Sequence, residues 1–379
     1  MAGLYFHIPF CVQACNYCDF HFSTRLKNRS AVVDAMLLEI DQARNTWGGD
    51  AFETLYFGGG TPSVLSDADL HRLADAAQSL GHWSMQEWTL EANPEDLSVD
   101  RLQSLRSLGV TRLSIGVQST DDRVLRWMNR AHSAAQAQRA VLDAAEAGFE
   151  HISVDLIYGV PLGGSREMLD GFERDLDAVL HMPIDHLSSY ILTAEPRTVY
   201  GHSIAKGLQI EMPGEDVAQQ YALLCSTTAQ AGYTHYETSN FALNKGSEGV
   251  HNSRYWAGSP YLGVGPGAHS FRGGERWWNL SNNPQYVRKM MAGEPVSEHE
   301  ALSDSDRFNE SVMTGLRTLR GVDSAQLLRE TGVELGLQPA LKNYQDKGWI
   351  VAENGIYRLR PEHWLIGDGV AADLFVVDA

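Results

Sequence analysis

Six apolar, strand-like runs recur along the first half of the chain, and each is followed by a stretch with helical periodicity. The runs are "LYFHIP" (4–9), "TLYFGG" (54–59), "EWTLEA" (87–92), "RLSIGVQ" (112–118), "HISVDLIYG" (151–159) and "HLSSYILT" (186–193). Amphipathic helices are predicted over 30–44, 66–81 and 98–109, with Ser30 as the N-cap of the first and a glycine ending each of the other two. Six β-then-α units predict an α/β fold with a parallel sheet, and six are too few for a closed eightfold barrel. We therefore expect a partial (β/α)6 barrel.

The alternation of predicted strands and helices becomes less regular after residue 205, and the sequence therefore predicts that the chain has three parts. Residues 1–205 would form the partial barrel. Residues 206–299, rich in Gly, Asn, Ser and aromatic residues from 240 onward, would form loops and strands that cover the barrel opening. Residues 300–379 read as helices followed by a hairpin that turns at Glu353-Asn354-Gly355, which is typical of a C-terminal α+β module of winged-helix type.

Composition and charge narrow the class of protein. The 379 residues carry a formal net charge of -18, and an acidic surface repels phosphate backbones, so we expect no nucleic-acid partner. No stretch approaches the length of an apolar membrane span, and the N-terminal residues lack the pattern of a signal peptide. We expect a cytoplasmic protein.

Three of the four cysteines, Cys11, Cys15 and Cys18, lie in "FCVQACNYCDF" (10–20), directly after the first predicted strand. Closely spaced thiolates bind zinc or iron–sulfur clusters. Zinc would need a fourth ligand nearby, whereas a [4Fe-4S] cluster on three cysteines leaves one iron open to a small molecule. Cys225 lies on a predicted helical apolar face, where a buried structural cysteine is expected.

The C-x3-C-x2-C spacing, with Tyr17 before the third cysteine, resembles the signature of the radical S-adenosylmethionine (SAM) superfamily. "GGGTP" (58–62), after the second strand, resembles the glycine stretch that meets the methionine end of SAM. The resemblance implies a [4Fe-4S] cluster on Cys11, Cys15 and Cys18 with SAM on the open iron. It also implies an electron donor, such as a flavodoxin or ferredoxin, if radical chemistry occurs.

Motifs along nearly the whole chain are similar to one branch of that superfamily, which contains the oxygen-independent coproporphyrinogen III oxidase and the haem chaperone HemW. They are "YFHIPFC", "LYFGGGTPS", "LEANPE", "SIGVQS", "MNRAHS" and "VDLIYGVP". The resemblance implies that one SAM contacts Tyr5, Gly59 and Glu91. It also implies that positions lining a second SAM in the oxidase correspond here to Gly60, Thr61, Gln118, Arg130 and Asp155.

Two departures separate the chain from the oxidase. The oxidase has a further cysteine two residues after the third, where this chain has Phe20, and it has a long segment before its first cysteine, where this chain has ten residues. In addition, "HNSRYW" (251–256) resembles the H-N-x-x-Y-W motif associated with haem in HemW-like proteins. His251 would be an axial ligand, and Tyr255 and Trp256 would supply flat apolar surface for a porphyrin. By its residues alone, the same stretch could instead cap a turn and pack into the core.

The resemblance therefore implies a HemW-like protein that binds a [4Fe-4S] cluster, SAM and haem and delivers haem to an apo-haemoprotein, with the respiratory chain as a candidate recipient. Peripheral contact with membrane proteins and a monomer or weak dimer are expected. Two alternatives stay open: radical decarboxylation of coproporphyrinogen III propionates, and a non-catalytic zinc module. Whether the chain is an enzyme is left undecided.

Overall fold

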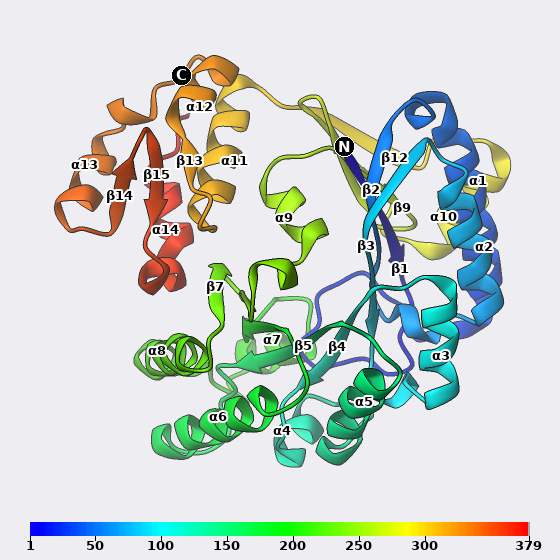
Figure 1. Cartoon of the computed structure of the whole chain (residues 1–379), viewed down its shortest axis with the longest axis horizontal. Helices are drawn as coiled ribbons and strands as arrows, with labels where there is room; N and C mark the ends of the chain where they lie inside the picture. The colour runs from blue at the N-terminus through cyan, green and yellow to red at the C-terminus, as the bar shows by residue number, and fades with distance from the viewer. Residues whose placement is uncertain (378–379) are drawn as a thin grey trace.

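A computed structural model describes residues 1–377. Its main feature is a twelve-stranded sheet in the order β12-β11-β10-β9-β1-β2-β3-β4-β5-β6-β8-β7 (Figure 1). The central strands are β1 (Ala2–Ile8), β2 (Ala51–Gly59), β3 (His82–Ala92), β4 (Arg112–Gln118), β5 (His151–Tyr158) and β6 (His186–Ile191). These six pair in parallel in chain order, which confirms the predicted (β/α)6 partial barrel.

The helices that connect these strands cover one face of the sheet. They are α1 (Arg29–Trp47), α2 (Asp67–Gln78), α3 (Val99–Leu108), α4 (Asp122–Trp127), α5 (Ala134–Glu146) and α6 (Ser165–Leu180). Ser66, the first residue of the helix predicted over 66–81, is the N-cap of α2 and accepts a hydrogen bond from the backbone of Asp69, and Gly109 ends α3 in the left-handed region. The prediction of Ser30 as an N-cap was wrong, because α1 already begins at Arg29 and Ser30 lies in its first turn.

Residues 206–299 add strands to both edges of the same sheet. β7 (Thr234–Glu237) and β8 (Asn240–Ala242) extend it beyond β6, whereas β9 (Tyr261–Val264), β10 (His269–Arg272), β11 (Glu275–Asn279) and β12 (Ser297–Ala301) extend it beyond β1. The helices nearby are α7 (Val199–Ala205), α8 (Gly214–Gln230), α9 (Val250–Trp256) and α10 (Asn283–Ala292). Of this segment, α9 lies against β2 and β3, in the centre of the view in Figure 1.

The C-terminal part forms a separate small sheet with its own helices. The predicted hairpin consists of β14 (Ile350–Glu353) and β15 (Ile356–Leu359), and Asn354 and Gly355 between them both have positive φ, as a tight two-residue turn requires. β13 (Val322–Asp323) pairs with β15. The helices are α11 (Asp304–Leu316), α12 (Ser324–Thr331), α13 (Pro339–Asp346) and α14 (Gly367–Ala372). The expected helix-plus-hairpin content is confirmed.

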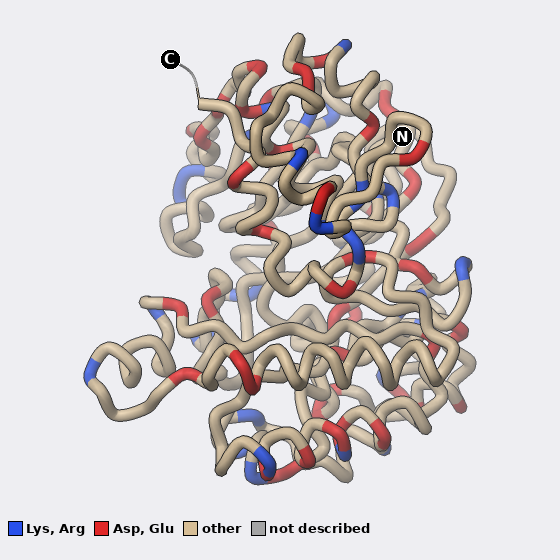
Figure 2. The backbone as a smooth tube through the Cα atoms, turned by 90° about the vertical axis from the view of Figure 1, so that its left-hand side faces the viewer, with Lys and Arg blue, Asp and Glu red and all other residues tan. Residues whose placement is uncertain are grey.

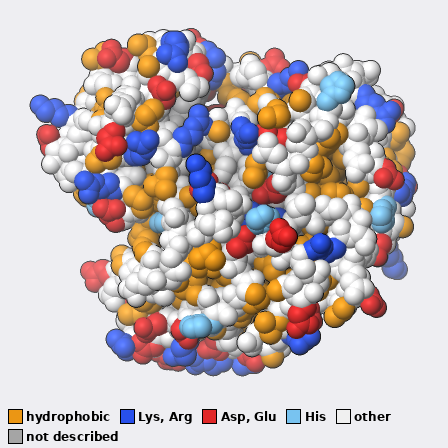
Figure 3. All heavy atoms as spheres, in the orientation of Figure 1, with side chains coloured by type: hydrophobic (Ala, Val, Ile, Leu, Met, Phe, Trp, Pro, Cys, Tyr) orange, Lys and Arg blue, Asp and Glu red, His pale blue; other side chains and the backbone are white. Residues whose placement is uncertain are grey.

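Acidic and basic residues are interspersed along the backbone in Figure 2. In the space-filling view the surface is indented below the C-terminal module, at the left (Figure 3). Among the described residues, no helix combines the length and the apolar character needed to cross a membrane.

Candidate functional site

The inner face of the barrel is largely polar, whereas the outer face is apolar and covered by helices. In β1 and β2, Leu4, Leu55 and Phe57 are fully buried against the helical layer. The residues that alternate with them, such as Tyr5 and Tyr56, face the inside and keep partial exposure. Because side chains of a strand alternate between the two faces, every second residue of these strands lies on the inner face.

The cysteine loop follows β1 and is held by the loop between α4 and α5. The backbone N–H of Asn16 donates to the carbonyl of Met128 at 3.1 Å. The side chain of Asn129 donates to the carbonyl of Ala14 at 2.7 Å, and Asn129 adopts a positive φ of 58° to do so. The "MNRAHS" stretch, at 128–133, thus positions the cysteine loop through hydrogen bonds.

Two predicted site residues contact the cysteines directly. Arg130 lies 3.3 Å from the sulfur of Cys15 and also donates to the carbonyl of Gly116 at 2.8 Å. The hydroxyl of Thr61 donates to the sulfur of Cys11 at 3.4 Å. Burial raises the pKa of Cys11 to about 12, so this thiol is not an activated nucleophile, and a metal would be needed to hold it as a thiolate.

The donor set suits an iron–sulfur cluster better than a single metal ion. Within residues 1–377, no group of three or more His, Cys, Asp or Glu side chains converges on one point as a zinc ion requires. A [4Fe-4S] cluster would take one thiolate from each of three cysteines and leave one iron open, which matches the number of cysteines on this loop. All four cysteines are free thiols, and three of them lie on this one loop.

The glycine stretch lies beside the cysteine loop at the end of β2. Gly59 has a φ of 105°, and a Cβ there would lie 2.7 Å from the ring of His7. A Cβ at Gly60 would lie 2.7 Å from the carbonyl oxygen of Phe10. Both positions therefore require glycine, and they leave the backbone bare where the resemblance implies the methionine end of SAM.

The side chain of Glu91, on β3, lies on the same inner face of the sheet. Its carboxylate accepts hydrogen bonds from the Tyr56 hydroxyl at 2.7 Å and from the backbone N–H of Gly59 at 3.1 Å. Burial raises the pKa of Glu91 to about 7, although these hydrogen bonds act to lower it. A partly exposed carboxylate next to the glycine stretch fits donors such as ribose hydroxyls.

Two more predicted residues lie on neighbouring strands. Asp155 on β5 accepts a hydrogen bond from the Ser114 hydroxyl at 3.2 Å, and burial raises the pKa of Asp155 to about 6. Gln118 ends β4 with a positive φ of 68°, an uncommon conformation for a residue with a side chain. The structure thus brings the predicted SAM residues together around one rim of the barrel, next to the cysteines.

His251 lies inside the barrel rather than at its surface. Its Nδ1 is 2.9 Å from the hydroxyl oxygen of Thr54, and its ring lies 5.0 Å from that of Tyr56 and 6.4 Å from that of Tyr5. A Cβ at Gly3 would lie 2.9 Å from His251 Cε1, so glycine on β1 makes room for the imidazole. Burial lowers the pKa of His251 to about 4, which keeps the ring neutral.

The Nε2 atom of His251 makes no hydrogen bond to any residue of the described chain. When Nδ1 donates to Thr54, Nε2 carries the free lone pair, which is the form that ligates iron. The donor therefore fits a haem iron, and the alternative that His251 merely caps a turn is not supported, since the N-cap of α9 is Gly249.

A buried ion pair fixes the start of α9. Glu87 on β3 accepts from Arg112 on β4 at 2.8 Å and from the backbone N–H groups of Val250 and His251 at 3.0 Å each. Arg112 also donates to the carbonyl of Ser247 at 3.0 Å. The ion pair between Glu87 and Arg112 therefore joins β3 and β4 to the segment that carries His251.

The other two residues of the predicted haem motif point toward the C-terminal module. Tyr255 is 47% exposed and its ring lies 5.4 Å from that of Tyr261 on β9. The guanidinium of Arg317, at the end of α11, lies 5.6 Å from the ring of Trp256. These aromatic side chains are therefore not sealed in a core.

Sequence reasoning missed three of the residues that shape this interior: Tyr56, Glu87 and Arg112. A signal was present, because each is a polar or amphipathic residue at an inner position of an otherwise apolar strand. It could not be used without knowing that α9, about 140 residues or more further along the chain, packs against these strands.

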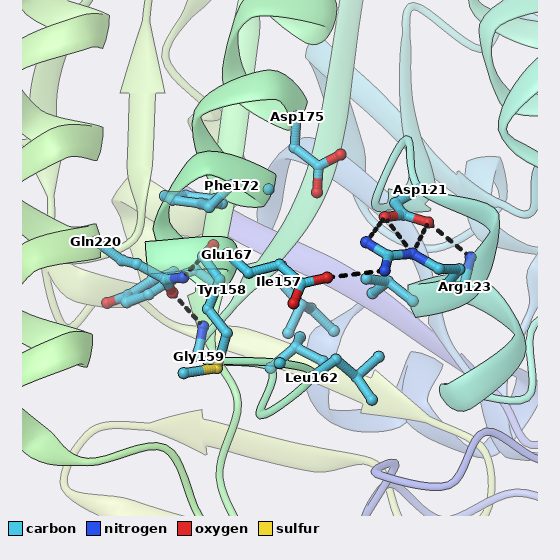
Figure 4. A pocket seen from close by; sticks show the side chains of 15 residues that line it. Asp121, Arg123, Ile157, Tyr158, Gly159, Leu162, Glu167, Phe172, Asp175 and Gln220 are labelled. Carbon is cyan, nitrogen blue, oxygen red and sulfur yellow. Dashed lines mark hydrogen bonds and ion pairs between the residues drawn. The ribbon is translucent and has the colours of Figure 1, made fainter. Parts of the chain in front are cut away.

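A separate cavity of about 320 Å³ lies at the end of β5 between α4, α6 and α8 (Figure 4). Three of its charged groups pair with one another, Arg123 with Asp121 at 2.9 Å and with Glu167 at 2.9 Å, and a fourth, Asp175, accepts hydrogen bonds from Ser119 and Thr120. None of the predicted site residues lines it.

Comparisons with known proteins agree with this arrangement. The radical SAM superfamily matches residues 5–170, and the HemN C-terminal domain matches residues 302–366. The chain is similar in fold to the coproporphyrinogen III oxidase HemN of Escherichia coli, with a TM-score of 0.84 and 21% identity, over 99% of this chain and 90% of that one.

Two curated relatives carry the description "Heme chaperone HemW". The protein of Bacillus subtilis (strain 168) is 34% identical over 98% of both chains. The protein of Lactococcus lactis subsp. lactis (strain IL1403) is 36% identical over 84% of this chain and 82% of its own. By this likeness over its whole length, the chain belongs to the HemW family of the radical SAM superfamily.

Proposed function

We propose that the protein is a haem chaperone that binds haem through His251, carries a [4Fe-4S] cluster on Cys11, Cys15 and Cys18, and passes haem to an apo-haemoprotein. The observation that carries the proposal is the state of His251. A neutral imidazole with an unpartnered Nε2 lies beside the partly exposed rings of Tyr5 and Tyr56.

The residues proposed to bind the cluster and SAM lie at the other end of the same barrel from His251. Three cysteine thiols on a loop anchored by Arg130 would hold the cluster, and Gly59 and Glu91 would meet SAM. When bound, a reduced cluster supplies an electron to the sulfonium of SAM. Candidates for the electron donor are a flavodoxin or ferredoxin, and a respiratory-chain protein is a candidate recipient of haem.

The oxidase alternative receives no support from the site. Phe20, at the position of the oxidase's additional cysteine, is 71% exposed and offers no ligand. The similarity to the E. coli oxidase concerns the fold. The zinc alternative needs four convergent ligands, which the described residues do not provide.

The test is an anaerobic haem titration of the reconstituted protein, followed by Soret absorbance. We expect His251→Ala to weaken haem binding at least about tenfold, because the iron loses its protein ligand. His181→Ala is the matched control, since His181 is 76% exposed at the end of α6. Equal haem affinity in His251→Ala and the wild type would contradict the proposal.

A second measurement tests the cluster independently. Iron and acid-labile sulfide should be present in the reconstituted protein and absent when Cys11, Cys15 and Cys18 are replaced together by Ser. Stoichiometric zinc without iron in the wild type would establish the zinc module instead.

A further inference from the structure

One side chain, Tyr56, stands between the residue expected to meet SAM and the residue expected to bind haem. Its hydroxyl donates to Glu91 at 2.7 Å, and its ring lies 5.0 Å from the ring of His251, tilted by 38°. Tyr5 lies beside it, with ring centroids 5.8 Å apart. Glu91, Tyr56 and His251 therefore form one continuous row of contacts.

The three side chains of this row are partly exposed. Glu91, Tyr56 and His251 each keep partial exposure, whereas Leu55 and Phe57, the outward neighbours of Tyr56, are fully buried. Tyr56 consequently lies in contact with both expected binding residues.

We propose that haem on His251 and SAM on Glu91 compete through Tyr56, whose side chain contacts both residues, so that each ligand lowers the affinity for the other. The inference rests on the proposed function, because it assigns haem to His251. It adds a regulatory consequence: SAM would favour release of haem from the chaperone.

The physical reason is the size of haem compared with the space between His251 and Glu91. One tyrosine side chain fills that space, and a porphyrin is much broader than a tyrosine side chain. Tyr56 has two side-chain torsions and is restrained at both ends, by the Glu91 carboxylate and by the His251 ring, so it cannot swing away freely. Interior groups packed in this way transmit displacement instead of absorbing it.

Thermodynamic linkage gives the expected size of the effect of each ligand on the other. If SAM lowers haem affinity by some factor, haem must lower SAM affinity by the same factor, and coupled sites typically differ by about 5- to 150-fold. We expect at least about a fivefold weakening of haem binding at saturating SAM. The experiment is a pair of anaerobic titrations on the cluster-loaded protein: haem with and without SAM, and SAM with and without haem.

Variants locate the contact. Tyr56→Ala removes the ring and should reduce the coupling factor several-fold, whereas Tyr56→Phe keeps the ring and should retain it. Tyr357→Ala is the matched control, because Tyr357 is a half-buried tyrosine on β15 of the C-terminal module and contacts neither Glu91 nor His251. Circular dichroism verifies folding. If Tyr56→Ala does not fold, the reciprocal titrations of the wild type still decide the competition.

The outcomes separate the two proposals. Haem and SAM that both bind the wild type with no effect on each other would overturn the competition and leave the proposed function standing. A wild type that binds SAM and no haem would overturn both. A coupling factor unchanged in Tyr56→Ala would overturn the assignment to Tyr56.

Discussion

Replacing Glu87 by Gln should both destabilise the barrel and loosen the haem ligand. Glu87 and Arg112 are each about 5% exposed, and the Glu87 carboxylate accepts three hydrogen bonds, one of them from the Arg112 guanidinium. Gln keeps the size but removes the charge and one acceptor, which leaves Arg112 buried without a counter-charge. Breaking one partner of a buried ion pair costs about 3–5 kcal/mol, and because the amide oxygen still accepts one bond we expect about 3 kcal/mol.

The free energy of unfolding is measured by urea titration of the wild type and Glu87→Gln under anaerobic conditions. Glu167→Gln is the matched control, because Glu167 pairs with Arg123 at the surface and surface pairs contribute about 1 kcal/mol or less. In the same variant, haem affinity should fall, since the backbone N–H of His251 loses its acceptor. A loss for Glu87→Gln no larger than that of Glu167→Gln would refute the reasoning that this pair fixes α9.

Three further predictions test other parts of the structure. Gly59→Ala should destabilise the protein by about 1–3 kcal/mol and weaken SAM binding because of the positive φ, whereas Gly214→Ala, at a site with nothing within 4 Å of the added Cβ, should be neutral or slightly stabilising in urea titrations. Cys15→Ser should abolish bound iron and sulfide, whereas Cys225→Ser should retain both in the same analysis. Burial raises the pKa of Glu39 to about 7 from an ordinary 4.5, so the native state holds an extra proton between these values. The free energy of unfolding should therefore fall by about 3 kcal/mol as pH rises through this window. Glu39→Gln, compared at pH values of about 5 and 8, should remove that slope, and a slope unchanged in the variant would contradict the assignment.

The barrel was predictable because its signals are local. The alternation of apolar and polar residues in runs such as 112–118 places one face against the helices, and β4 has these bounds in the structure. Capping residues such as Ser66, Ser98 and Gly109 act within one helical turn, so they can be read from neighbouring residues. The start of α1 was not predicted correctly, because no side chain caps it.

The edges of the sheet could not be predicted in the same way. The strands from β7 to β12 are three to five residues long. The pairings that attach them to the barrel are distant in sequence: β8 pairs with β6, and β9 pairs with β1 across more than 250 residues. Short strands carry too few residues for a clear alternation, and pairing over such distances depends on the assembled sheet.

For the site, the sequence by itself determined the chemistry: three thiols on one loop, a glycine stretch, acidic residues at strand ends, and a histidine followed by two aromatic residues. Those features follow from residue type and close spacing. Only the tertiary structure shows that the ring of His251 occupies the space that a Cβ at Gly3 would fill. It also shows that Glu87 and Arg112 bind the start of α9, which carries His251. Finally, it shows that Tyr56 contacts both His251 and Glu91. These contacts link strands to a helix far along the chain, and they exist only after the sheet has brought its inner faces together.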